Sequence, residues 1–176
     1  MKPQITADLY RKTFFFPVAK FYESLELPSS GFEYAQQLNQ TSHMKLLRAT
    51  VPFLRNGLDP AVVIVASKNV PAPGPGAAAY SVAKAGLTQM ARIAALELGE
   101  AGIRVNVLHP NAVYDTAIWS EDVLASRAAH YGLSVEEYKT SNVLKTEVAA
   151  MDVAKAVTVF AGQSLAKTTG AQLPVD

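Results

Sequence analysis

The feature that most constrains the fold is an unbroken aliphatic run, AVVIVA, at residues 61–66. A β-branched run without polar alternation is typical of a strand buried on both faces, as in a parallel sheet. A long helical pattern follows at residues 77–102, and a second strand pattern, IRVNVLHP, follows at residues 103–110. This order of strand, helix and strand predicts an α/β fold, with helices packed on a mostly parallel sheet.

The rest of the chain is consistent with one domain of this class. Its 176 residues suggest a single domain. Apolar residues between Leu38 and Leu54 recur at three- and four-residue spacings, which predicts a helix that NGLDP (residues 56–60) ends. We also expect helices within residues 116–139 and 148–162, and a final strand in GAQLPVD. Residues 31–176 are therefore assigned to the α/β unit, and residues 1–30 to an atypical N-terminal segment.

Composition excludes several classes of function. The formal net charge is +1 and no basic run is present, so nucleic acid is not an expected partner. The longest aliphatic run is far shorter than the roughly 20 residues that span a bilayer, and no signal peptide is recognised, so we expect a cytoplasmic protein without a membrane partner. The chain has no cysteine, and its three histidines have no metal-binding spacing, so no metal site is predicted: His43, His109 and His130.

Three polar residues surround the proline-rich loop that follows the first predicted strand. Ser67 lies at the strand end, and Tyr80 and Lys84 are four residues apart at the start of the next helix, so they share one face. A nearby ammonium stabilises a phenolate, so we expect Lys84 to lower the pKa of Tyr80 and make it a proton donor and acceptor. Ser67 could polarise a substrate oxygen. Taken singly, each residue is better explained as a surface or turn residue, whereas the set of three favours catalysis.

Ser67, a gap of twelve residues and Tyr80-x-x-x-Lys84 together resemble the catalytic signature of short-chain dehydrogenases/reductases. The segment YSVAKAGLTQMARIAALELGEAGIRVNVLHP is similar to the helix and strand that follow it in that family. The resemblance extends over roughly residues 33–176. The segment SKNVPAPGPGAAAYSVAKAG is more specifically similar in sequence to the dehydrogenase module of bifunctional rhamnulose-phosphate aldolase/alcohol dehydrogenase proteins.

The resemblance implies hydride transfer between NAD or NADP and a small alcohol or carbonyl compound, such as a sugar-derived aldehyde. It implies that Tyr80 exchanges the substrate proton, while Lys84 also binds the nicotinamide ribose. Ser67 would orient the substrate oxygen, and Asn39 would hold a water in a proton relay. The segment HPNAVYDT resembles one that lies against the nicotinamide in the family, although Asn111 replaces a glycine there. Further cofactor contacts are carried over to three of its residues: Pro110, Val113 and Thr116.

The glycine-rich loop that binds the cofactor pyrophosphate in this family is absent, because only Gly31 and Gly57 precede Ser67. GPGAAA, residues 74–79, formally fits a phosphate-binding pattern, but its long distance from the strand and its prolines favour a structural turn. We therefore expect a partial Rossmann-like, doubly wound parallel sheet that lacks the N-terminal glycine-rich βαβ unit. The alternative function is that of a truncated, non-catalytic fragment acting as an interaction module.

A partial fold of this kind would expose apolar surface. The aromatic residues of the N-terminal segment could cover part of it: Phe14, Phe15, Phe16, Phe21 and Tyr22. In the family, the helices that correspond to residues 38–54 and 79–98 commonly pack against their counterparts, which implies a homo-oligomer; alternatively, both helices only cover their own sheet. Trp119, Tyr131 and Tyr138 lie in a region that forms a substrate lid in the family, and they could line a pocket or pack together.

Overall fold

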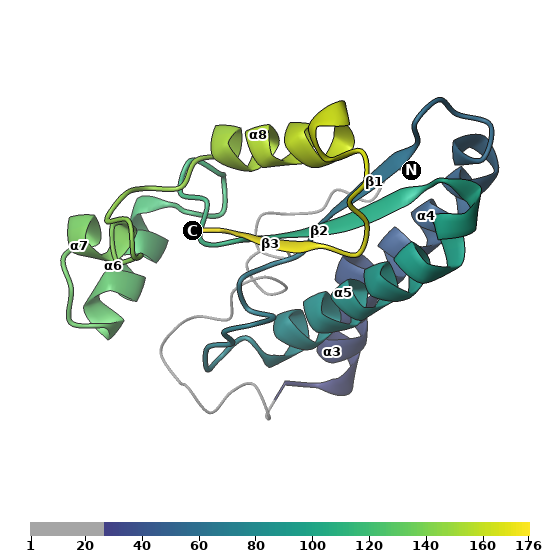
Figure 1. The fold of residues 1–176 in the computed structure, drawn as a ribbon. Helices are drawn as coiled ribbons and strands as arrows, with labels where there is room; N and C mark the ends of the chain where they lie inside the picture. Colours follow the sequence, from purple (N-terminus) through teal and green to yellow (C-terminus); the bar gives the residue numbers. More distant parts are fainter. Residues whose placement is uncertain (1–26) are drawn as a thin grey trace, which may run out of the picture.

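A computed structural model describes residues 27–176. Three parallel strands form the sheet in the order β1-β2-β3: β1 (Ala61–Val65), β2 (Arg104–Pro110) and β3 (Gln172–Val175). Helix α5 (Ala78–Leu98) covers one face together with α3 (Ser29–Gln36) and α4 (Ser42–Leu54). Helix α8 (Ala150–Ala161) covers the other face (Figure 1). This confirms the predicted α/β, doubly wound parallel arrangement.

The core lies between α5 and the sheet. Alanine and leucine side chains of α5 pack with Val105 and Val107 of β2 and with Ile103 just before it, all three almost completely buried. Small alanine side chains let the helix approach the strands closely. Helix α4 adds Leu47, Val51 and Leu54 to the edge of this core. Helix α5, which carries Tyr80 in its first turn, is therefore held firmly against the sheet.

The prediction that the AVVIVA run is buried on both faces is wrong for β1. Only Ile64 in this strand is buried, and Val65 is 40% exposed. The reason is topological, because β1 lies at an edge of the sheet that residues 27–176 form. The strand that is buried along its whole length is β2, at the centre of the sheet. Its buried polar side chains are all hydrogen-bonded: Arg104 to the end of α8, Asn106 to the loop before β3, and His109 to the carbonyl of Ser67.

The helix predicted around Leu38–Leu54 forms, but with an irregularity that periodicity did not predict. Between α3 and α4 lies a π-helical segment, η1 (Gln37–Thr41). Such segments are rare and frequently occur at functional sites. Asn39, a predicted site residue, lies inside it and is only 4% exposed.

Beyond the strand ends, α6 (Glu121–His130) and α7 (Val135–Lys139) form a separate helical region (Figure 1). Two short 3₁₀ helices complete the description: η2 (Gly99–Ala101) and η3 (Gln163–Leu165). In the described residues, no helix combines the length and the apolar character needed to cross a membrane. The aromatic residues at positions 14–22 lie outside the described residues, as does most of the N-terminal segment.

Candidate functional site

Ser67, Tyr80 and Lys84 come together at the carboxyl end of β1. Ser67 follows the strand by two residues, whereas Tyr80 lies in the first turn of α5 and Lys84 lies one turn later. The side chains of Ser67 and Tyr80 are hydrogen-bonded to each other. The Lys84 ammonium lies 5.8 Å from the centre of the Tyr80 ring and donates a hydrogen bond of 3.1 Å to the carbonyl of Val65. The spacing in the sequence thus corresponds to a compact polar cluster.

Burial dominates the electrostatics of this cluster. It raises the pKa of the Tyr80 phenol above its ordinary value, and the hydrogen bond with Ser67 opposes this shift. Burial also lowers the pKa of Lys84 to about 8. The expectation that Lys84 would lower the pKa of Tyr80 is therefore wrong for the chain alone, because the apolar surroundings destabilise the phenolate. In this state Tyr80 is a neutral phenol at neutral pH.

A network of hydrogen bonds fixes the backbone around Ser67. The hydroxyl of Ser67 accepts from the backbone N–H of Asn69 at 3.2 Å. Its carbonyl is 2.9 Å from Nδ1 of His109, which is 3% exposed. The backbone of the next residue, Lys68, donates to the carbonyl of Pro110 at 2.9 Å. This contact of His109 was not predicted from the sequence, in which its one signal is the position at the carboxyl end of β2.

Asn39 lies on the helical segment that packs against the start of α5. Its amide donates to the carbonyl of Ala35 at 3.1 Å. One turn earlier, Gln36 donates to the carbonyl of Ala79 at 3.0 Å, next to Tyr80. Burial lowers the pKa of His43, and the nearby charge of Lys84 lowers it further, so His43 also lies near the cluster. The π-helical segment therefore adjoins the cluster, whereas the catalytic role of Asn39 stays a prediction.

The segment after β2 lies at the same edge of the sheet. Asn111 donates its backbone N–H to Val175 of β3 at 2.9 Å, and its side chain donates to the carboxylate of Asp176. Lys68 forms an ion pair of 3.0 Å with that carboxylate. The side chain at the position where the family has a glycine thus joins the three strand ends. This cluster was not predicted either, because its members are distant in the sequence.

The remaining predicted cofactor residues continue this segment. Pro110 is the last residue of β2 and is buried. Val113 forms an isolated parallel bridge with Val148, and the hydroxyl of Thr116 donates to the carbonyl of Val113 at 2.8 Å. These contacts give the segment a fixed path beyond the sheet. Contact of these three residues with a cofactor remains a prediction.

The aromatic residues beyond the strand ends pack against one another. Tyr138 is stacked on Tyr131 with ring centres 5.7 Å apart, and Tyr114 lies 5.0 Å from Trp119 and 6.0 Å from Tyr138. Such pairs stabilise the α6–α7 region by their ring contacts. Of the two readings left open by the sequence, mutual packing is the one that the geometry supports directly. In residues 27–176, no group of three or more possible metal ligands occurs.

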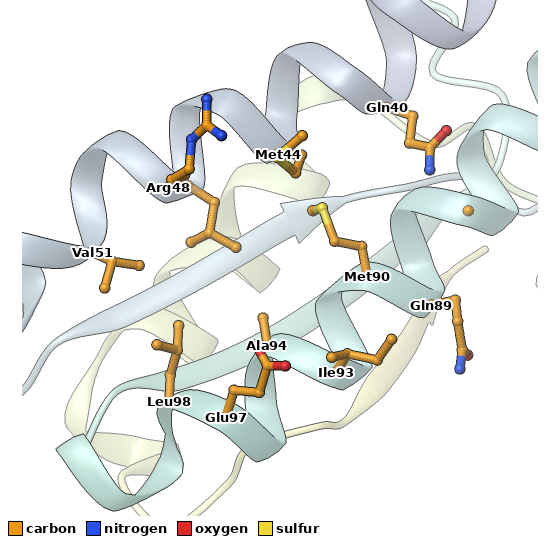
Figure 2. A pocket seen from close by; sticks show the side chains of 12 residues that line it. Gln40, Met44, Arg48, Val51, Gln89, Met90, Ile93, Ala94, Glu97 and Leu98 are labelled. Atoms are coloured by element: carbon orange, nitrogen blue, oxygen red, sulfur yellow. The ribbon is translucent and has the colours of Figure 1, made fainter.

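A groove of about 530 Å³ lies between α4 and α5, and none of the predicted catalytic residues lines it. Figure 2 shows side chains of both helices facing this groove, among them Met44 and Met90. Arg48 and Glu97 lie on opposite sides of it. Because its lining is mainly apolar and it is separate from the Ser67 cluster, we treat the groove as a candidate contact surface.

Comparison with known proteins agrees with this fold. A family model described as enoyl-(acyl carrier protein) reductase matches residues 16–176. The chain is 41% identical over 120 residues to the uncharacterized oxidoreductase YuxG of Bacillus subtilis, which covers 65% of this chain and 17% of YuxG. It is 31% identical over 152 residues to an uncharacterized NAD-dependent oxidoreductase of Mycobacterium tuberculosis, which covers 86% of this chain and 55% of that protein.

Solved structures show the same architecture. An NADPH-bound short-chain oxidoreductase from Pseudomonas aeruginosa PAO1, with an atypical catalytic center, matches with a TM-score of 0.75 and 26% identity, covering 86% of this chain and 58% of that one. Sorbitol-6-phosphate 2-dehydrogenase from Erwinia amylovora matches with a TM-score of 0.77, and at 22% identity this likeness concerns the fold alone.

The fold and the matches together define a Rossmann-like domain similar to those of known oxidoreductases. The chain belongs to the short-chain dehydrogenase/reductase family. It spans 55% of the M. tuberculosis relative, 60% of the E. amylovora enzyme and 17% of YuxG.

Proposed function

We propose that residues 31–176 form the catalytic part of an NAD(P)-dependent dehydrogenase that interconverts a small alcohol and the corresponding carbonyl compound. The observation that carries this proposal is the hydrogen bond between Ser67 and the neutral Tyr80, beside the buried Lys84. In carbonyl reduction Tyr80 donates its proton to the substrate oxygen, which the Ser67 hydroxyl orients. In alcohol oxidation the deprotonated form of Tyr80, its phenolate, accepts that proton. A bound nicotinamide supplies or receives the hydride.

The described residues fit the nicotinamide end of such a cofactor. The hydrogen bond from Lys84 to Val65 uses one of the three N–H donors of a lysine ammonium, so two remain for ribose hydroxyls. The low exposure of Lys84 strengthens such bonds, since water competes with them less. By contrast, residues 27–176 contain no glycine-rich loop after a strand that would hold the pyrophosphate. The proposal therefore requires phosphate contacts from elsewhere.

Cofactor binding tests the proposal. We expect NADH or NADPH to change its nicotinamide fluorescence on titration with the full chain, and to raise the melting temperature. Lys84→Met should weaken this binding at least roughly tenfold, since it removes a buried ribose donor. Lys155→Met is the matched control, because Lys155 is 71% exposed on α8, and it should bind like the unmodified chain.

The absence of binding at millimolar cofactor would instead support the second candidate function, a non-catalytic interaction module. One observation favours that candidate, namely that residues 27–176 contain no glycine-rich loop after a strand that would hold the cofactor pyrophosphate. Equal binding by the Lys84→Met variant would contradict the proposed role of Lys84.

The groove between α4 and α5 supports a homo-oligomer as part of this proposal. Exposed apolar side chains line it, including Met44 at 39% and Ile93 at 45% exposure. Arg48 on α4 and Glu97 on α5 lie on opposite sides, so a two-fold axis through the groove would pair each with the opposite charge of the second copy. A second copy of this chain is therefore the proposed occupant.

Charge placed in the groove should separate the copies. We expect Ile93→Glu to give a monomer in light scattering coupled to gel filtration, because two unpaired carboxylates would be buried at the contact. Leu96→Glu lies on the same helix, is 82% exposed and does not line the groove, so it should leave the oligomer intact. If Ile93→Glu and Leu96→Glu give the same size as the unmodified chain, the groove is not the interface.

The finer substrate assignment is a sugar-derived aldehyde such as lactaldehyde, within the cytoplasm. This assignment is supported by the sequence similarity of the segment SKNVPAPGPGAAAYSVAKAG to the dehydrogenase module of bifunctional rhamnulose-phosphate aldolase/alcohol dehydrogenase proteins. The match to YuxG is consistent with a module of a longer protein, because 120 residues that make up 17% of YuxG imply a total of about 700. Screening C3 hydroxyaldehydes against longer aldehydes tests this assignment.

A further inference from the structure

His109 makes a contact that the proposed proton transfer does not use. It lies at the carboxyl end of β2, buried, with both ring nitrogens occupied. Nδ1 is 2.9 Å from the carbonyl oxygen of Ser67, and Nε2 is 3.0 Å from the amide group of Gln172 on β3. The ring therefore connects the catalytic serine to the strand on the other side of β2.

Chemistry fixes the direction of the first of these contacts. A carbonyl oxygen can only accept, so Nδ1 must carry a hydrogen and donate it to Ser67. The amide of Gln172 can present either its oxygen or its NH₂ group to Nε2. It can therefore satisfy the imidazolium through the oxygen and the neutral ring through the NH₂ group. The hydrogen bond to Ser67 is available in both protonation states.

The surrounding backbone shows why this bond matters at Ser67. Ala66 and Lys68 donate their backbone N–H groups to Leu108 and Pro110 of β2, at 2.8 and 2.9 Å. At Ser67 itself the chain turns, since its carbonyl also accepts from the N–H of Val70 at 3.1 Å. Where the backbone hydrogen bonds between β1 and β2 end, the side chain of His109 therefore supplies a further hydrogen bond. This bond orients the peptide group of Ser67.

We propose that His109 is a positioning residue, which holds the backbone of Ser67 so that the serine hydroxyl meets Tyr80. The proposal rests on the proposed function in one respect, namely that the contact between Ser67 and Tyr80 is the reacting pair. The proposed positioning role also involves β3, because Gln172 on that strand orients the His109 ring. Loss of the Nδ1 donor would let the turn at Ser67 rotate and would separate the two hydroxyl groups.

Titration of Tyr80 tests this without cofactor or substrate. The full chain is labelled with ¹³C at the tyrosine ring carbon that bears oxygen, and Tyr80→Phe identifies the Tyr80 signal. His109→Leu should raise the pKa of Tyr80 by roughly one unit, the size of one lost hydrogen bond to the phenolate. His109→Asn should leave it within a few tenths of a unit, because the asparagine NH₂ group can replace the Nδ1 donor.

Asn106→Leu is the matched control. Asn106 lies on β2, is 0% exposed and bonds the loop before β3 through Thr168 and Ala171. Its loss should destabilise the fold without moving the Tyr80 signal. If His109→Leu does not fold, His109→Gln replaces it, since a glutamine NH₂ group imitates Nε2 rather than Nδ1 and should also raise the pKa of Tyr80.

Two outcomes would overturn the proposal. One is an unchanged pKa of Tyr80 in folded His109→Leu or His109→Gln; the other is a shift in His109→Asn as large as in His109→Leu. Where the unmodified chain turns over substrate, kcat should fall in His109→Leu while the affinity for cofactor stays constant. Failure of cofactor binding would overturn the proposed function alone, because the Tyr80 titration does not depend on it.

Discussion

Replacing Tyr80 with phenylalanine should lower the rate of hydride transfer by about a thousandfold. The phenol is the acidic group that the structure brings to the Ser67 hydroxyl, and a phenylalanine ring retains its packing but cannot donate a proton. The Lys84 ammonium cannot take over, because it lies 5.8 Å from the ring centre and is bonded to Val65. The measurement is the loss of NADH or NADPH absorbance with a panel of small aldehydes and ketones.

The matched control is Tyr131→Phe, which removes a hydroxyl from a half-exposed ring in the aromatic cluster and should leave the rate within about twofold. Circular dichroism and cofactor titration of Tyr80→Phe should match the unmodified chain. A Tyr80→Phe variant with undiminished turnover would refute the proton-transfer role of Tyr80.

Replacing Arg104 with methionine should lower the free energy of unfolding by about 3 kcal/mol or more. The guanidinium is buried at the start of β2 and donates to the carbonyls at the end of α8, at 2.6 Å to Phe160 and 3.1 Å to Ala161. It also pairs with Asp59 at 3.5 Å. A positive charge at a helix C-terminus is stabilising, and methionine would fill the space while leaving those carbonyls without a donor.

Urea denaturation measures this effect. Arg92→Met serves as the control, because Arg92 is exposed on α5 and bonds only Gln89 of the same helix in the described structure, so the change should cost less than about 0.5 kcal/mol. Equal stability of the Arg104→Met variant and the unmodified chain would show that water replaces the guanidinium at the end of α8.

The order of elements could be predicted from the sequence because it depends on local patterns. The run at Ile103, Val105 and Val107 marks one face of β2, and the break at Gly102, where φ is +71°, marks the end of the helical region before it. The burial of β1 was not predictable in this way, since it depends on which strands lie beside it. The π-helical segment at Asn39 was missed because one extra residue per turn barely disturbs an apolar period.

The residues of the candidate site also differ in whether local sequence patterns could predict them. Ser67, Tyr80 and Lys84 were accessible because a strand end and the next helix start enclose them within eighteen positions of the sequence. His109 and Asp176 act across strands, and no spacing rule relates them to Ser67. The raised pKa of Tyr80 was also out of reach, because it reflects burial, which depends on the packed structure.

The contacts between strand ends around Ser67 have a consequence for the order in which the molecule folds. Lys68 and Asp176 are 108 residues apart, and His109 and Gln172 are 63 apart. Closing such long loops costs conformational entropy that local contacts do not, so they form after the nearby helix and strands have docked. During synthesis, Tyr80 and Ser67 leave the ribosome well before Gln172 does. The candidate site around Ser67 is therefore expected to acquire its final geometry among the last steps of folding.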